Sequence, residues 1–281
     1  MTDSSVDNAS AARCLINGHL GAGIPVTDRG LAYGDGVFET MRVGRGRIVL
    51  LDYHLNRLRR GLAALRMPVD LAATVLELEA EAERLHTGVI KLTLTRGTGR
   101  RGYAIPAEFT PTRICQSFPL VSHAPEHARE GVRLFECQTR LALQPMLAGI
   151  KHLNRLEQVL ARSEWSDPDY AEGLVRDTQG NVIECTMSNL FLLENGCWVT
   201  PDLGSCGVQG VMRDYLIDQL ARIGEPVSIR SVPMATVLSS DEVFCCNSLY
   251  GVWPVVGLAQ SRWPVGPRTR RVQALAEQVL V

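Results

Sequence analysis

The sequence contains no long apolar stretch and no excess of charge of either sign. No hydrophobic run approaches the roughly 18 to 20 residues that a helix needs to cross a bilayer, and residues 1–12 are polar, without the apolar centre of a signal peptide. Lysine and arginine number 29 against 30 acidic residues, so a net charge of −1 offers no electrostatic basis for binding nucleic acid or an anionic membrane. We therefore expect a cytoplasmic protein that binds a small molecule, with no nucleic-acid and no membrane partner.

Motifs for metals, nucleotides and disulfides are missing as well. The sequence has no Walker A motif, no GxSxG, no HExxH and no Cys/His cluster with metal-ligand spacing, so no metal is expected. The eight cysteines form no CxxC pair and fit small buried side chains. Residues 97–102 (GTGRRG) match GxGxxG formally, but Pro106 and Pro111 follow where a dinucleotide site needs a helix. A nucleotide-binding oxidoreductase using this loop is therefore the disfavoured alternative.

Lysine is almost absent, because Lys91 and Lys151 are the only two among the 29 basic residues. Arginine stays protonated, so an amine nucleophile that forms a Schiff base has only these two candidate positions. Lys151 follows Ala148 and Gly149 and precedes a helical pattern, a junction from which an amine can project into a cleft. Lys91 lies in an alternating strand pattern that predicts a solvent-facing side chain, whose loss should be nearly harmless. Lys151 is therefore the preferred candidate.

Helical and strand patterns are mixed along the chain, which predicts the α+β class in two domains. We expect a disordered leader at 1–12, a small N-terminal α+β domain at 13–121, a polar linker at 122–130 and a larger C-terminal domain at 131–281. Residues 28–36 are predicted as a loop. Helices are predicted at 51–67, 71–85, 153–165, 211–222 and from about 268, and strands at 14–16, 37–43, 89–95, 112–121, 132–137, 173–177, 182–185, 190–193, 198–200, 226–230 and 242–246.

Five ordered segments resemble one enzyme family. Residues 150–160 (IKHLNRLEQVL) are similar to the lysine motif of fold-type IV pyridoxal 5′-phosphate enzymes, and the other matches are 28–30 with 33–38, 54–58, 182–184 with 188–191, and 207–213. The resemblance extends from about Leu15 to Val255. It implies a fold like that of D-amino-acid aminotransferase, a homodimer, and pyridoxal 5′-phosphate bound between the two domains by a cofactor-binding domain at 131–281.

The resemblance also implies cofactor-binding roles for particular residues. Lys151 would hold the cofactor covalently and then act as acid and base, while Glu184 would keep the pyridine nitrogen protonated, since a nearby opposite charge raises its pKa. The phosphate would be bound at the start of the predicted helix 211–222, where exposed amides and the helix dipole favour an anion. The matching phosphate residues are Arg57, Val211, Met212, and Ser248 with the preceding Asn247.

Within the family, the sequence is most similar to the lyases that convert 4-amino-4-deoxychorismate to 4-aminobenzoate and pyruvate in folate biosynthesis. Thr40 stands where branched-chain aminotransferases have glycine and would assist proton delivery to the leaving enolpyruvyl group. Arg101 would anchor a carboxylate, in a loop without the Arg-x-His arrangement of D-amino-acid aminotransferases. Arg155 occupies a position where aminotransferases tend to carry tyrosine. Tyr33 and Phe38 complete the expected substrate residues, and an aminotransferase acting on D- or branched-chain amino acids remains the alternative.

Overall fold

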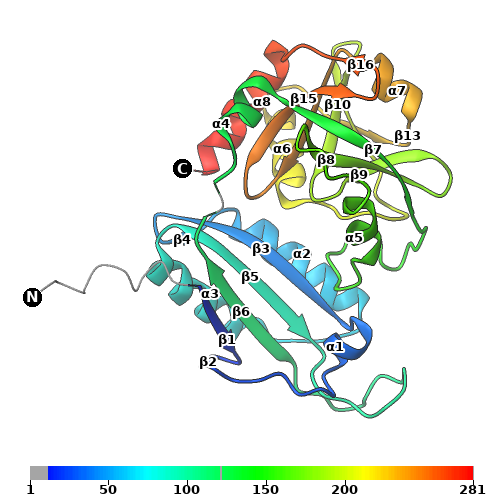
Figure 1. Ribbon diagram of the computed structural model, residues 1–281. Coiled ribbons are helices and arrows are strands. Elements are labelled where there is room, and N and C mark those ends of the chain that lie inside the picture. Colours follow the sequence, from blue (N-terminus) through cyan, green and yellow to red (C-terminus); the bar gives the residue numbers. More distant parts are fainter. Residues whose placement is uncertain (1–11, 121, 281) are drawn as a thin grey trace, which may run out of the picture. The chain divides into compact units, whose positions relative to one another are not determined.

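The computed structural model describes residues 12–120 and 122–280, which form two compact units (Figure 1). Unit 1 contains the described residues up to Ser122 together with Lys151–Asn154, and unit 2 contains His123–Ile150 and Arg155–Leu280. Lys151–Asn154, which the sequence analysis placed in the C-terminal domain, thus belongs to unit 1. The predicted leader lies outside the described residues except for Ala12.

Unit 1 is an antiparallel sheet with two of its three helices, α2 and α3, packed on one face. Its six strands lie in the order β2-β1-β6-β5-β3-β4. The strands are β1 (Arg13–Ile16), β2 (His19–Leu20), β3 (Gly36–Gly44), β4 (Arg47–Ile48), β5 (Gly88–Thr95) and β6 (Thr112–Phe118), and the helices are α1 (Arg29–Tyr33), α2 (Leu51–Ala64) and α3 (Ala72–Leu85).

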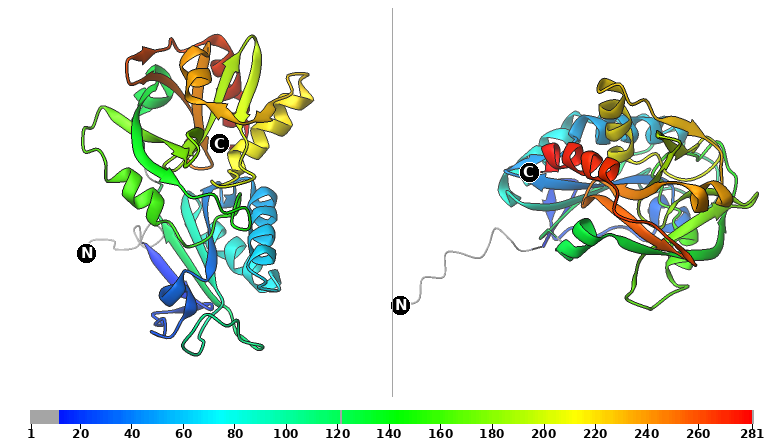
Figure 2. Two further views of the ribbon diagram at one scale, coloured as in Figure 1. Left: turned by 90° about the vertical axis from the view of Figure 1, so that its right-hand side faces the viewer. Right: turned by 90° about the horizontal axis from the view of Figure 1, so that it is seen from above.

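The side chains of β3 alternate between the two faces of this sheet, one covered by helices and one open. Its odd-numbered side chains from Val37 to Val43 are buried, whereas Phe38, Thr40 and Arg42 are half-buried, as the alternation of a strand requires. Figure 2 shows α2 and α3 on the same side of the sheet. Leucines of both helices share one hydrophobic core with Val37, Met41 and Val43. Phe38, Thr40 and Arg42 therefore point to the open face.

Unit 2 is built on a ten-stranded mixed sheet. Its main path runs β12-β11-β10-β14-β15-β7-β8-β9-β13, and β16 pairs with β15. The strands are β7 (Val132–Leu141), β8 (Tyr170–Asp177), β9 (Asn181–Cys185), β10 (Asn189–Glu194), β11 (Cys197–Pro201), β12 (Ser228–Arg230), β13 (Val232–Pro233), β14 (Glu242–Asn247), β15 (Gly251–Leu258) and β16 (Ser261–Arg262). The helices are α4 (Pro125–Glu130), α5 (Leu156–Arg162), α6 (Val211–Arg222), α7 (Met234–Ser239) and α8 (Pro267–Leu280).

The predicted α+β class is confirmed, and the local differences have physical causes. The expected loop at 28–36 contains α1, because the Asp28 side chain accepts a hydrogen bond from the Gly30 N–H and caps the helix, which ends at Gly34 with φ of +67°. The expected linker contains α4, with Pro125 in its first turn. Strand β15 has no counterpart in the sequence prediction, and it carries Pro254 at a central position that proline usually avoids.

Three further features concern metal ligands, membrane-spanning helices and cysteines. Among the described residues no group of three or more His, Cys, Asp or Glu side chains could hold a metal ion. Within the same residues, no helix has the length and apolar character needed to cross a bilayer. Six of the eight cysteines are buried as expected, whereas Cys14 and Cys197 are exposed.

Candidate active site

Lys151 is held against the first residues of β3 by backbone hydrogen bonds. Its carbonyl oxygen accepts from the Phe38 N–H at 2.9 Å, and the Leu153 N–H donates to the Gly36 carbonyl at 3.0 Å. An antiparallel bridge pairs Val37 with the residue that follows Lys151. The side chain is half-buried, and its Nζ lies 4.6 Å from the centre of the Phe38 ring. The backbone of unit 1 therefore determines where the amine lies.

The second lysine contacts the same aromatic ring. Lys91 on β5 is half-buried, and its Nζ lies 5.6 Å from the centre of the Phe38 ring. Because β3 and β5 pair antiparallel, Lys91 stands directly opposite Thr40, and the two side chains share the open face of the sheet. The expected solvent-facing lysine is thus part of a group with Phe38, Thr40 and Lys151.

Arg57 is buried in an ion pair on the covered face of the sheet. Its Nε and Nη2 donate to the Glu39 carboxylate at 2.8 and 2.5 Å, and His54 Nδ1 lies 2.6 Å from the same carboxylate. Burial alone would raise the pKa of Glu39, but the Arg57 charge and the hydrogen bonds from Arg57 and His54 outweigh it and lower the pKa to about 2. Burial lowers the pKa of His54, although Glu39 opposes this effect.

Glu39 and His54 were missed as site residues by the sequence analysis. The available signal was the position of Glu39 on the buried side of an alternating strand, where a charged group needs a partner. Its partners His54 and Arg57 lie on α2, 15 and 18 residues later in the sequence. No local sequence pattern connects the two segments.

Tyr33 and the loop that carries Arg101 contact each other. The Tyr33 hydroxyl accepts a hydrogen bond from the Gly102 N–H at 3.0 Å, and its ring packs edge-on against Tyr103 at 5.4 Å. Arg101 itself is exposed. The middle of the loop is also held by Arg29, whose guanidinium donates to the Gly102 carbonyl at 3.0 Å and lies over the Tyr33 ring. The two residues that follow Arg101 are therefore fixed against Tyr33.

Glu184 lies on β9 of unit 2 with its carboxylate buried. Its Oε2 accepts a hydrogen bond from the Val208 N–H at 2.9 Å, and Gln158 Nε2 lies 3.5 Å from its Oε1. Arg155 precedes α5 in the same unit. Burial lowers the pKa of the Arg155 guanidinium, and the charges of Glu184 and Glu157 act in the opposite direction. Arg155 and Glu184 thus interact electrostatically.

The first turn of α6 presents backbone amides without a side-chain cap. Gly210 is the N-cap residue and makes no capping hydrogen bond, and Val211 and Met212 are buried. A Cβ on Gly210 would come within 1.9 Å of Asn189 Oδ1, so only glycine fits there. Asn189 in turn donates to the Val208 carbonyl at 2.9 Å. These contacts hold the loop before α6 against β10.

Asn247 organises the turn that carries Ser248. Its Oδ1 accepts from the N–H groups of Leu249 and Tyr250 at 2.9 and 3.0 Å, and its Nδ2 donates to the Met187 carbonyl at 3.3 Å. The side chain of Asn247 is therefore used in positioning backbone, and Ser248 lies within the turn that it stabilises.

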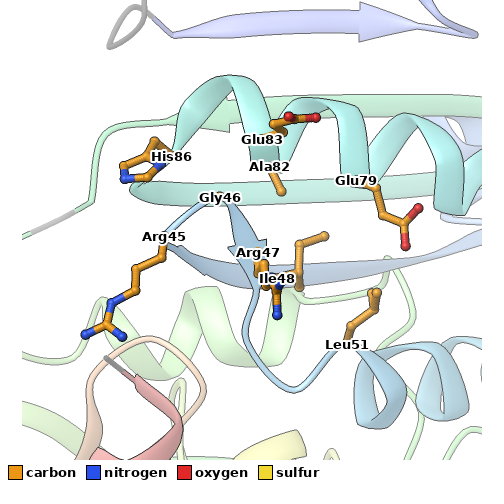
Figure 3. Close-up of a pocket in the computed structure, with 9 residues that line it drawn as sticks. All are labelled: Arg45, Gly46, Arg47, Ile48, Leu51, Glu79, Ala82, Glu83 and His86. Atoms are coloured by element: carbon orange, nitrogen blue, oxygen red, sulfur yellow. The ribbon is translucent and has the colours of Figure 1, made fainter.

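A cavity of about 630 Å³ in unit 1 is lined by none of the predicted site residues. Figure 3 shows the β3–β4 hairpin, with Arg45 and Arg47, beside α3, which carries Glu79 and Glu83, and the Arg45 side chain extends away from this helix. The mixed charges of this cavity distinguish it from the open face with its two lysines. The predicted site residues are divided between the two units, and within unit 1 Arg57 contacts the covered face of the sheet whereas Phe38 and Thr40 lie on its open face. Unit 1 holds Tyr33, Phe38, Thr40, Arg57, Arg101 and Lys151, and unit 2 holds Arg155, Glu184, Val211, Met212, Asn247 and Ser248.

Comparison with known proteins agrees with these motifs. Residues 36–258 match the amino-transferase class IV family. The aminodeoxychorismate lyase of Vibrio harveyi is 36% identical over 263 residues, which cover 92% of this chain and 97% of the relative. The crystal structure of 4-amino-4-deoxychorismate lyase from Pseudomonas aeruginosa is 50% identical, with a TM-score of 0.93 over 95% of this chain and 100% of that one.

A more distant structure shares the fold. A hypothetical aminotransferase from Mycobacterium tuberculosis in its PLP-bound form is 20% identical, with a TM-score of 0.83 over 96% of this chain and 99% of that one. The expected fold of fold-type IV enzymes is thereby confirmed. The match extends over most of the sequence, and the chain belongs to the amino-transferase class IV family.

Proposed function

We propose that this chain is a pyridoxal 5′-phosphate-dependent lyase that converts 4-amino-4-deoxychorismate to 4-aminobenzoate and pyruvate, a step of folate biosynthesis. The observation that carries the proposal is the Lys151 amine over the Phe38 ring, on a strand that places Thr40 two residues further along. The two lyases that resemble the chain over more than nine-tenths of its length support the same reaction.

The residues present fit pyridoxal 5′-phosphate. The uncapped amides of Val211 and Met212 suit a phosphate, and Gly210 packs so closely against Asn189 that the start of α6 is held in place. Arg57 would add a guanidinium that Glu39 already orients, and Ser248, in the turn set by Asn247, would add a hydroxyl.

Glu184 and Lys151 would hold the other end of the cofactor. Glu184 offers a buried carboxylate for the pyridine nitrogen, fixed by the Val208 N–H, and Lys151 offers the amine that binds the cofactor covalently. When bound, the cofactor supplies an electron sink for the bond that breaks at the carbon bearing the substrate amine.

The reaction needs one proton removed and one delivered. The Lys151 amine would take the proton from the ring carbon that bears the substrate amine. The carbon–oxygen bond to the enolpyruvyl group then breaks as the ring becomes aromatic, and the Thr40 hydroxyl would help to protonate the departing group, which becomes pyruvate. Arg101, Tyr33, Phe38 and Arg155 would orient the substrate, with Arg101 as a carboxylate contact.

Product release tests the proposal. Purified, cofactor-loaded protein is mixed with enzymatically generated 4-amino-4-deoxychorismate, and pyruvate and 4-aminobenzoate are measured for the wild type, Lys151→Ala and Arg47→Gln. Arg47 is an exposed arginine of the β3–β4 hairpin, so its loss controls for removal of one positive charge from unit 1. We expect equal release of both products by the wild type and Arg47→Gln, and none by Lys151→Ala. Normal turnover by Lys151→Ala, or no release by the wild type, overturns the proposal.

Amino transfer is the second candidate, favoured by the family description itself. An aminotransferase would move the amino group of D-alanine or a branched-chain amino acid to the cofactor and release the corresponding oxo acid. Oxo-acid release from these amino acids, without 4-aminobenzoate formation, would identify this activity.

We also propose that the protein is a cytoplasmic homodimer, in line with the family resemblance. Helix α5 leaves Leu156, Val159 and Leu160 exposed by 77, 59 and 58%, an apolar face that a second copy could cover. Light scattering after size exclusion should give twice the chain mass, and Leu160→Glu should shift it toward the monomer. A monomeric wild type contradicts the proposal.

A further inference from the structure

We propose that Lys91 is a substrate-binding residue that contacts a carboxylate of the substrate and so favours dicarboxylates over monocarboxylates. This inference rests on the proposed function, because it places the contact beside the amine of Lys151. It departs from the sequence-based expectation that Lys91 faces solvent and can be lost almost without effect.

Phe38 brings the two lysines of the chain together. The Lys151 and Lys91 nitrogens lie 4.6 and 5.6 Å from the centre of its ring, both within the range of a cation–π interaction. The strand register places Lys91 opposite Thr40, and Phe38 opposite Thr93. A molecule that reacts at the Lys151 amine and lies along Phe38 and Thr40 would therefore pass close to the Lys91 ammonium.

The surroundings of Lys91 leave its positive charge without an acidic partner. Within residues 12–120 and 122–280, no carboxylate oxygen forms an ion pair with its ammonium. Its neighbours across the sheet are Thr40 on β3 and Gln116 on β6, and Arg42 follows Thr40 on the same face. A half-buried cation among neutral and cationic side chains attracts an anion, because it has lost water without gaining a negative charge.

Three arginines of unit 1 differ from Lys91 in having carboxylate partners. Arg57, Arg96 and Arg113 each bond a carboxylate of the same unit, on Glu39, Asp35 and Glu77 respectively. Their charges are used within the fold. Lysine differs from arginine in presenting a compact ammonium with three rotatable donors, which suits a contact that forms only when a ligand arrives. The chemistry of the ligand follows: an anionic oxygen group, and a carboxylate where the substrate is 4-amino-4-deoxychorismate, which carries two.

Steady-state kinetics of Lys91→Gln and Lys91→Arg test this role, with Arg47→Gln as the charge-matched control. We expect Lys91→Gln to raise KM at least about tenfold and to change kcat by less than about threefold, as for loss of one charged binding contact. Lys91→Arg should restore most of the affinity, and Arg47→Gln should resemble the wild type. A fall in kcat at unchanged KM, or wild-type values for Lys91→Gln, overturns the inference. Circular dichroism and thermal unfolding establish that each variant is folded.

A binding measurement separates this inference from the proposed function. Calorimetric titration of the cofactor-loaded protein compares isophthalate, a dicarboxylate, with benzoate, a monocarboxylate that Arg101 alone could hold. The wild type should bind isophthalate more tightly, and Lys91→Gln should lose that preference while Arg47→Gln keeps it. If the wild type releases no product but the preference depends on Lys91, the carboxylate site stands and the lyase proposal fails. If the wild type is a lyase and Lys91→Gln changes neither KM nor the preference, the inference about Lys91 fails alone.

Discussion

Glu39 and Arg57 form a two-point ion pair inside unit 1, with N–O distances of 2.8 and 2.5 Å. Both side chains are at least 95% buried, so the charges are removed from water and each depends on the other. The pair joins β3, which carries Phe38 and Thr40, to α2, which carries the proposed phosphate contact. It therefore links two parts of the proposed site.

Glu39→Gln should destabilise the protein by about 3 to 5 kcal/mol at pH 7, because it leaves the Arg57 charge buried without its partner. The pKa of Glu39 is lowered to about 2 in the folded protein, so its contribution is present above the unfolded pKa and is lost as the pH falls toward 2. Urea unfolding at pH 7 and pH 3 measures both effects, and the gap between wild type and variant should narrow at pH 3. The exposed Glu130→Gln serves as control. A gap that is the same at both pH values contradicts this assignment.

Phe38→Leu should lower kcat/KM by about tenfold, since it removes the ring that both lysine ammonium groups contact. Phe38→Tyr keeps the ring and should stay close to the wild type. Release of 4-aminobenzoate at several substrate concentrations measures the effect. Similar losses in the leucine and tyrosine variants would show that the cation–π contacts are not responsible.

Glu184→Gln should lower kcat by at least about a hundredfold while leaving the fold intact, because the amide oxygen can still accept from the Val208 N–H but no longer carries charge. Turnover of the cofactor-loaded protein and its unfolding midpoint in urea are the measurements. Glu194→Gln, which removes a carboxylate paired with Arg230 on the same sheet, is the matched control. Activity close to the wild type in Glu184→Gln argues against its role at the pyridine nitrogen.

Glu172 should make the protein less stable as the pH rises through the weakly acidic range. Burial raises its pKa to about 6, although hydrogen bonds from the Thr186 and Ser188 hydroxyls and the Met187 N–H act against this. Because its pKa is higher in the folded than in the unfolded protein, protonated Glu172 stabilises the fold below the unfolded pKa. This stabilisation is lost as the pH rises through the folded pKa. Between pH 4.5 and 7, ionisation of Glu172 should therefore lower the free energy of unfolding by about 2 kcal/mol.

Glu172→Gln removes this ionisation and should flatten that part of the profile. Urea unfolding at pH 4.5 and 7 for the wild type and the variant gives the comparison. The lower absolute stability of the variant, which has lost acceptor capacity for three donors, does not affect the difference between the two pH values. Parallel profiles for the two proteins would contradict the raised pKa of Glu172.

Local patterns in the sequence located most elements. Helix α6 has the bounds 211–222 that its periodicity predicted, and β14 differs from its predicted range only by the addition of Asn247. Helix α1 was missed because its five residues contain too little periodicity and depend on the Asp28 cap and Gly34. A helix of 12 residues shows its periodicity within a short stretch of sequence, whereas a helix of five residues does not.

The sequence by itself determined the α+β class, the family and the preference for Lys151, since these depend on ordered motifs and on the scarcity of lysine. Only the tertiary structure placed Lys91 beside Phe38 and Glu39 against Arg57. The physical reason is that alternation assigns a side chain to one face of a strand, but strand register and helix packing decide what it meets there. Residues about fifty positions apart become neighbours through the pairing of β3 with β5, a contact that neither segment specifies alone.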